Sequence, residues 1–220
     1  MNGVKISKNL HNSLNQCRLG VLIANVKVEP SSDQFNALMD KAHLTLIDEL
    51  AVKNEKEFEV IAQTRAAYKQ CGKEPSRYRP SAEALLRRLR TKRSLYRINN
   101  VVDMINLSSM TSKFSIGGFD LNNIEGDIVC DIGNANPYAA IGRGSLNIES
   151  MPGLKDDKGF FGTPTSDSER TMVTSDTSEL LLIYYDFYGH PSLEEAMDYS
   201  AQLIKNHCYG QIKHANIEEY

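Results

Sequence analysis

The run ELLLIYYDF, Glu179–Phe187, is the feature that most restricts how this chain folds. Six apolar or aromatic residues follow one another from Leu180 to Tyr185, and this composition is typical of a β-strand. A second run, Leu19–Val28 (LGVLIANVKV), is apolar and β-branched and predicts a buried strand. Any fold for this chain therefore has to include a β-sheet with a buried strand.

Five segments have the spacing and end signals of helices. Ser31, Ser32 and Asp33 supply a cap for the first of them. Ser81 is the predicted N-cap of the helix that contains ALLRRLRTKR, and Ser192 begins a predicted capping box. The helical segments are 33–46, 55–70, 81–93, 99–110 and the stretch that follows 192.

After Gly117-Gly118 the chain breaks into short strand-like runs separated by turns: 127–132, 138–141, 146–148, 171–173 and 179–187. Helices first and short strands afterwards indicate an α+β fold with a mostly antiparallel, β-rich core, not an alternating parallel sheet. No segment has the length of a linker between independent domains. We therefore expect one unit over 1–220, in which 1–75 supply a strand and helices and 76–220 form the β-rich core with a C-terminal helix.

Composition excludes several classes of protein. No apolar run approaches the roughly 20 residues that cross a bilayer, and the N-terminal segment MNGVKISKNLHNSL lacks the apolar stretch of a secretory signal. We expect a cytoplasmic protein with no membrane partner. The isolated Cys17, Cys71, Cys130 and Cys208 form no CxxC pair and are expected to be reduced, packed thiols. The five histidines form no HExxH motif, so we expect neither a metal nor a cofactor.

Charge is distributed unevenly along the sequence. Residues 73–97 hold nine Lys or Arg against two Glu, a net charge of +7, whereas the rest of the chain holds 16 cations and 26 carboxylates, a net charge of −10. Phosphate contacts need clustered cations, so this basic stretch indicates a surface for a polyanion. The alternative is a solvated helix face. The candidate phosphate-binding residues are Arg87, Arg88, Lys92 and Arg93.

Three segments are rich in glycine or polar residues where a plain core would be apolar. They are Gly117–Asp120, Ile141–Ser145 and the loop Thr163–Thr171 (TPTSDSERT). Such a loop is costly to bury unless its groups bond to one another or to a ligand. The alternative for the loop is a turn in which Asp and Ser cap their own backbone.

Four motifs follow one another along the second half of the chain: YRINNVVDMINL (Tyr96–Leu107), IGGFDL (Ile116–Leu121), IGRG (Ile141–Gly144) and TPTSDSERTMVTSDTSELLLIYYDF (Thr163–Phe187). In series they resemble the B3/B4 domain of the phenylalanyl-tRNA synthetase β subunit, a module that also occurs as a separate protein. The resemblance implies a three-layered α+β fold with a β-sandwich and flanking helices. It also implies tRNA as the ligand, because that domain hydrolyses tyrosine wrongly esterified to the phenylalanine tRNA.

Carried over residue by residue, the resemblance gives Glu169 as the acidic residue that reads the misplaced hydroxyl. It gives Asn106 as the polar residue after VVD, and these two are the candidate catalytic residues. The candidate pocket residues are Gly117, Gly118, Gly142, Arg143, Gly144, Thr165, Ser166 and Ser168. We expect them to converge on one cavity into which Glu169 points. Two positions depart from the family pattern, because Ile105 and Gly117 replace the polar Thr and His.

Three functions remain open at this point. The first is a trans-acting factor that hydrolyses a misacylated tRNA, with glycine N–H groups as oxyanion donors and Glu169 either polarising water or reading the side chain. The second is a non-catalytic tRNA- or RNA-binding module, which the missing histidine favours. The third is a pocket for a free amino acid or another small metabolite. None of the three involves DNA, and the oligomeric state is not predicted.

Overall fold

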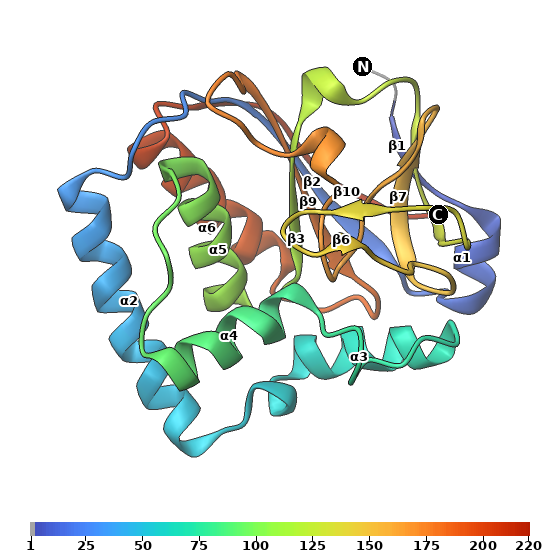
Figure 1. Ribbon diagram of the computed structural model, residues 1–220, viewed down its shortest axis with the longest axis horizontal. Coiled ribbons are helices and arrows are strands. Elements are labelled where there is room, and N and C mark those ends of the chain that lie inside the picture. The colour runs from blue at the N-terminus through green and yellow to red at the C-terminus, as the bar shows by residue number, and fades with distance from the viewer. Residues whose placement is uncertain (1–2) are drawn as a thin grey trace.

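The computed structural model describes residues 3–220 and consists of two four-stranded sheets packed face to face, with helices against one of them (Figure 1). The helices are α1 (Lys8–Ser13), α2 (Asp33–Val52), α3 (Glu59–Gln70), α4 (Ser81–Lys92), α5 (Asn100–Ser112) and α6 (Leu193–His207). The strands are β1 (Val4–Ile6), β2 (Arg18–Asn25), β3 (Ile116–Asp120), β4 (Ile128–Ile132), β5 (Ala139–Ala140), β6 (Gly144–Ser145), β7 (Pro152–Asp156), β8 (Gly159–Gly162), β9 (Glu179–Asp186) and β10 (Gln211–Glu218). Short 3₁₀ turns are η1 (Glu55–Glu57), η2 (Leu121–Asn123) and η3 (Glu169–Thr171).

The first sheet has the strand order β1-β4-β7-β8 and the second has the order β10-β2-β9-β3. All pairs are antiparallel except β1 with β4. β5 and β6 form a separate two-stranded ribbon, which crosses in front of the sandwich in Figure 1. Each sheet combines one strand from the start of the chain with three from the second half. β1 and β2 lie within residues 4–25, and the other strands lie within 116–218.

The strand β9 is buried on both faces, which accounts for its continuous apolar sequence. Leu181, Ile183 and Tyr185 point between the two sheets and pack with β1, β4, β7 and β8. The alternate residues Leu180, Leu182 and Tyr184 point to the opposite face, where they pack against helices. Side chains alternate along a strand, so a strand with layers on both sides needs apolar residues at every position.

Helices form the third layer. α5 and α6 pack on the outer face of the β2–β9 pair, together with Phe35 and Met39 of α2. A separate apolar cluster joins α2, α3 and α4 to the end of α5, with Leu46, Ile61, Leu86 and Leu89 at its centre. In Figure 1 these helices lie to the left of and below the sandwich, so that α4 runs beneath the β5–β6 ribbon.

The structure confirms the predicted α+β fold with three layers, a β-sandwich and flanking helices. It also confirms that Ser32 caps α2, since its side chain accepts from the Phe35 N–H. None of the helices among residues 3–220 is long and apolar enough to cross a membrane. Met1 and Asn2, the start of the segment judged to lack a signal sequence, lie outside the described residues.

Several local predictions are wrong. The predicted strands at 146–148 and 171–173 are not strands, because η3 and extended loops occupy these positions. Ser81 is the first residue of α4 and its side chain caps nothing; its N–H donates to the Pro164 carbonyl instead. Ser192 sits at the N-cap of α6, but its hydroxyl bonds to His190 Nδ1.

The two-sided burial of β9 gives a stability prediction. Leu182→Ala should lower the free energy of unfolding by about 2–5 kcal/mol, because the side chain is fully buried between the sheet and the helices. Leu44→Ala removes the same atoms from a position on α2 that is 66% exposed and should change stability by less than about 0.5 kcal/mol. Urea unfolding of both variants measures the difference. Equal losses would mean that this face of β9 is not a tightly packed core.

Candidate functional site

The polar loop between β8 and η3 is held by bonds within itself. Thr163 Oγ1 accepts hydrogen bonds from the N–H groups of Thr165 and Ser166, at 3.3 and 3.1 Å, and donates to the Ser166 carbonyl at 2.9 Å. These three bonds satisfy backbone groups that can no longer bond to water once the loop is buried. Residues 163–166 therefore form a closed turn, but the side chain that caps it is Thr163 and not the Asp or Ser that the turn alternative expected.

Two tyrosines and the start of α4 fix the loop to the rest of the molecule. The Tyr68 hydroxyl of α3 lies 2.8 Å from Thr165 Oγ1, and the Tyr138 hydroxyl donates to the Ser166 carbonyl at 2.8 Å. The Ser81 N–H donates to the Pro164 carbonyl at 2.7 Å. The basic helix α4 therefore begins directly beside the polar loop.

Asp167 joins three segments that are far apart in the sequence. Its carboxylate accepts a hydrogen bond from the Gly118 N–H at 3.1 Å, on the free edge of β3. Its carbonyl accepts from the Ile141 N–H at 2.9 Å, and the next residue, Ser168, pairs with Ala140. The structure thus brings the glycine pair, the IGRG segment and the polar loop together at one residue.

Burial changes the acidity of Asp167. The residue keeps some exposed surface, but its carboxyl group lies deep among protein atoms, and this desolvation raises its pKa to about 8. The Gly118 N–H opposes the shift only in part. Asp167 is accordingly a carboxyl group that changes protonation near neutral pH, unlike an ordinary surface aspartate.

Neighbouring side chains fill the space beside Gly117 and Gly118, so no open cavity lies there. A Cβ on Gly117 would lie 2.4 Å from Phe119 Cζ, and a Cβ on Gly118 would lie 2.3 Å from Ile105 Cδ1. Packing within the protein therefore explains why both positions are glycine. Because the Gly118 N–H already bonds to Asp167, it is not free to stabilise an oxyanion in this arrangement.

The expectation that Glu169 points into a shared cavity is wrong. Glu169 is exposed, and no hydrogen bond or ion pair of its side chain occurs among residues 3–220. Its neighbour Arg170 turns inward and holds Asp156 with two bonds of 2.9 and 2.8 Å. The Ser168 hydroxyl accepts from the Arg170 N–H and fixes this turn, η3, so that Glu169 faces outward.

Asn106 is not bonded to the polar loop. It lies on α5 one turn after Val102, and both residues are half-buried on a helix whose other residues before Thr111 are buried. The preceding residue, Ile105, is the one that covers Gly118. Asn106 makes no side-chain hydrogen bond to the residues that the structure describes.

Gly142 and Gly144 form the exposed turn between β5 and β6. Their φ angles are +66° and +67°, and both need glycine, because other residues rarely adopt this conformation. No atom lies within 4 Å of a Cβ built on either one. The turn therefore displays Arg143 to solvent between two glycines.

A basic groove of about 610 Å³ lies between α4 and this turn. It is lined by Arg79, Ala84, Arg87, Arg88, Thr91, Lys92, Ser94, Tyr96 and Arg143. Five of these nine residues are cations, and none is acidic. Arg93, the fourth predicted phosphate-binding residue, is exposed at the C-cap of α4 but does not line the groove.

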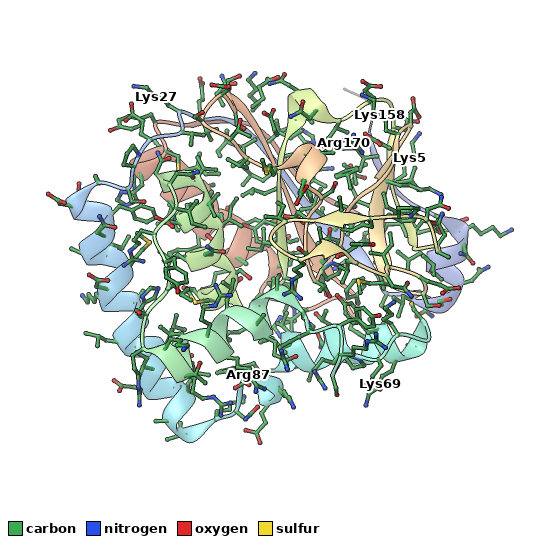
Figure 2. All side chains as sticks on the ribbon, viewed as in Figure 1. Lys5, Lys27, Lys69, Arg87, Lys158 and Arg170 are labelled. Atoms are coloured by element: carbon green, nitrogen blue, oxygen red, sulfur yellow. The ribbon has the colours of Figure 1, made fainter. Side chains whose placement is uncertain are left out.

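Ion pairs divide the basic stretch into two sets. Arg79, Arg90 and Arg97 pair with Glu83, Glu55 and Asp40. In contrast, no ion pair holds Arg87, Arg88, Lys92 or Arg93 within residues 3–220. Figure 2 shows Arg87 at the opposite end of the molecule from Lys5, Lys27 and Lys158. Lys73 and Arg77 of the stretch also make no ion pair among these residues, so the four predicted phosphate-binding residues are two-thirds of the six cations that no carboxylate holds.

The cysteines are free, as expected, and Cys17, Cys130 and Cys208 are buried. Burial raises the pKa of the Cys17 thiol to about 12. In the part of the chain that the structure covers, no three His, Cys, Asp or Glu side chains gather in a way that could hold a metal ion.

Comparison with known proteins identifies the family. A family model described as the B3/4 domain matches residues 63–209, more than half of the chain, and the chain belongs to this family. No curated protein matches it. Among solved structures it is similar to an N-terminal fragment of the phenylalanyl-tRNA synthetase beta-subunit from Pyrococcus horikoshii, with 13% identity and a TM-score of 0.49. That match covers 100% of this chain and 55% of the fragment, so the chain spans about half of the fragment's length.

Sequence reasoning missed Asp167, Tyr68 and Tyr138. Asp167 stands in the same polar run as Glu169, and no local pattern distinguishes the inward carboxylate from the outward one. Tyr68 and Tyr138 lie in separate segments, and only the folded chain brings their hydroxyls to the loop. The sequence did carry a partial signal for Asp167. A carboxylate between two serines in a loop that is buried needs hydrogen-bond donors from elsewhere in the fold.

The raised pKa of Asp167 predicts a pH-dependent stability. Its pKa is higher in the folded protein than in the unfolded chain, so the folded state binds more protons between about pH 4 and pH 8. The stabilisation that protonated Asp167 gives to the folded state is complete below about pH 4 and is lost as the pH rises to about 8. The free energy of unfolding should fall over this range by at most about 1.4 kcal/mol per pH unit.

Urea unfolding of the native protein and of Asp167→Asn across this range tests the prediction. Asn keeps an acceptor for the Gly118 N–H and removes the titration, so the variant should gain stability relative to the native protein as the pH rises. Parallel pH profiles for the two proteins would contradict a raised pKa.

Proposed function

We propose that this protein binds tRNA through the basic groove between α4 and the Gly142–Gly144 turn. The observation that carries the proposal is the lining of the groove, which has five cations and no carboxylate. Nucleic-acid backbones are bound by such clusters because each contact releases a condensed counterion. The sequence resemblance to the editing module of a tRNA synthetase supports the same ligand.

A solvated helix face accounts for the groove less well. Arg87, Arg88 and Lys92 alone would fit that reading, because exposed arginines on a helix are common. Arg143, however, comes from a separate ribbon and lines the same hollow, held out by two glycines with positive φ. Bringing four like charges together without a carboxylate costs electrostatic energy, and an anionic ligand would recover it.

The position of the groove suggests how a charged tRNA would lie. α4 starts at the polar loop, where the Ser81 N–H bonds to Pro164 and the Tyr68 hydroxyl bonds to Thr165. A backbone bound along α4 would therefore direct its end toward Asp167. Hydrolysis of a misacylated tRNA is accordingly the second candidate function, with Asp167 in place of Glu169. A carboxyl group with a pKa near 8 suits proton transfer at neutral pH.

The binding proposal predicts a change in salt dependence. The triple variant Arg87→Ala, Arg88→Ala, Lys92→Ala should bind tRNA more weakly, and the slope of log affinity against log salt should fall by about two to three units. The matched control removes the same charge from the other end of the molecule, by Lys5→Ala, Lys27→Ala and Lys158→Ala (Figure 2). Filter binding across a salt series measures both. Identical slopes for the two triple variants would sink the proposal.

The hydrolysis candidate has its own test, a deacylation assay that begins with tyrosine on the phenylalanine tRNA. If Asp167 transfers the proton, Asp167→Asn should lower the rate by about 10²–10⁴-fold, while the exposed Glu169→Gln should keep it. A rate lost only in Glu169→Gln would restore Glu169 as the catalytic residue. Binding without turnover in the native protein would leave a non-catalytic tRNA-binding module.

A further inference from the structure

Tyr96 is an exposed aromatic residue inside the basic groove. Its side chain is 81% exposed, although it lines the same hollow as four arginines and a lysine. Among residues 3–220, no stacked ring and no cation over its face was found. A tyrosine that is four-fifths exposed contributes little to the fold, so its position requires another explanation.

The segment that carries Tyr96 is anchored on both sides. Arg93 ends α4 with its N–H on the Leu89 carbonyl, and the Ile98 N–H donates to the Asp103 carboxylate at 3.0 Å. Between them, Arg97 pairs with Asp40 of α2. These contacts hold the backbone on both sides of Tyr96, so the segment is positioned at the groove with less of the ordering cost that a free loop would have.

We propose that the groove binds an unpaired stretch of RNA, in which one base stacks on Tyr96 while Arg87, Arg88, Lys92 and Arg143 contact the adjoining phosphates. This inference rests on the proposed tRNA binding and specifies which part of the RNA is bound. A cationic groove with an aromatic platform is the combination that binds single strands, because every unpaired base has a face to stack.

A duplex does not satisfy this arrangement. In an A-form helix the bases stack on one another inside the helix, so their faces are closed to a protein side chain. Only the phosphates would reach the groove, and Tyr96 would have no partner. The hollow of about 610 Å³ is within the range of small-ligand pockets.

The hydroxyl groups at the groove add a second element of recognition. Thr91 and Ser94 line it, and their hydroxyls donate to the Arg87 and Lys92 carbonyls at 2.9 and 3.5 Å. Their oxygens can still accept a hydrogen bond from a ribose 2′-hydroxyl, the group that distinguishes RNA from DNA. At the far end, Arg143 stands two residues after Ile141, whose N–H donates to the Asp167 carbonyl of the polar loop. The groove therefore extends from Tyr96 to a turn that is bonded to the polar loop.

The chain contains no tryptophan, and this allows a direct test. Tyr96→Trp places the only tryptophan of the chain at the platform, where it can be excited apart from the tyrosines, and stacking of a base should quench its emission. The probes are an unstructured RNA of about eight nucleotides and the same sequence closed in a hairpin stem. We expect quenching by the single strand and little by the stem. Tyr209→Trp, at a position that is 70% exposed and outside the groove, is the control and should respond to neither.

Affinity gives an independent measurement. Tyr96→Ala should weaken binding of the single strand by about 5- to 150-fold, whereas Tyr96→Phe keeps the ring and should bind as the native protein does. Tyr209→Ala should have no effect. Unchanged affinity in Tyr96→Ala, or equal quenching by the stem, would overturn the inference and indicate a surface that reads duplex RNA.

Intact tRNA, measured in parallel, separates this inference from the proposed function. If tRNA binding depends on Arg87, Arg88 and Lys92 but not on Tyr96, tRNA binding stands and the unpaired-strand inference fails. If the single strand binds and quenches Tyr96→Trp while tRNA does not bind, the inference stands for RNA and the proposed tRNA function fails. If neither RNA binds the native protein, both fail.

Discussion

The burial of β9 on both faces is the constraint on which the rest of the structure depends. One face of β9 needs the sheet β1-β4-β7-β8, and the other needs α5 and α6, so three layers follow from one strand. The neighbours of β9 are set by the same requirement. β2 supplies a second apolar strand beside it, and β3 forms the edge where Asp167 bonds to Gly118. The candidate site therefore lies at the edge strand β3, where the second sheet of the sandwich ends.

Much of the fold was predictable because it depends on local patterns. The two buried strands, the helix cap at Ser32 and the apolar stripes are signals that a few neighbouring residues carry. The strands β1, β3, β7, β8 and β10 were not predicted. For β10 the reason is that Gln211–Glu218 is an edge strand with few apolar residues, so its sequence resembles a loop. The strand predicted at 171–173 is absent for a different reason. Its residues lie at and just after η3, and the bond from the Arg170 N–H to the Ser168 hydroxyl sets this turn.

The candidate site was predictable by segment but not by side chain. The motifs indicated that the glycine pair, the IGRG segment and the polar loop belong together, and Asp167 does join them. Which carboxylate faces inward depends on a tertiary hydrogen bond from β3 and on the Arg170–Asp156 pair that turns Glu169 outward. Such contacts join residues many positions apart, and no local spacing reports them. The groove needed the same long-range information, because Arg143 and α4 are about 50 residues apart in sequence.

The internal pairing of the basic stretch has a consequence for how the protein meets other molecules. Glu83, Glu55 and Asp40 neutralise Arg79, Arg90 and Arg97, whereas Arg87, Arg88 and Lys92 at the groove make no ion pair, in a molecule whose net charge is −3. Under the proposed function, the acidic remainder of the surface would repel a polyanion and the groove would attract it, so the two molecules would be oriented before contact. The small net negative charge would then favour one docking orientation over the others instead of preventing binding.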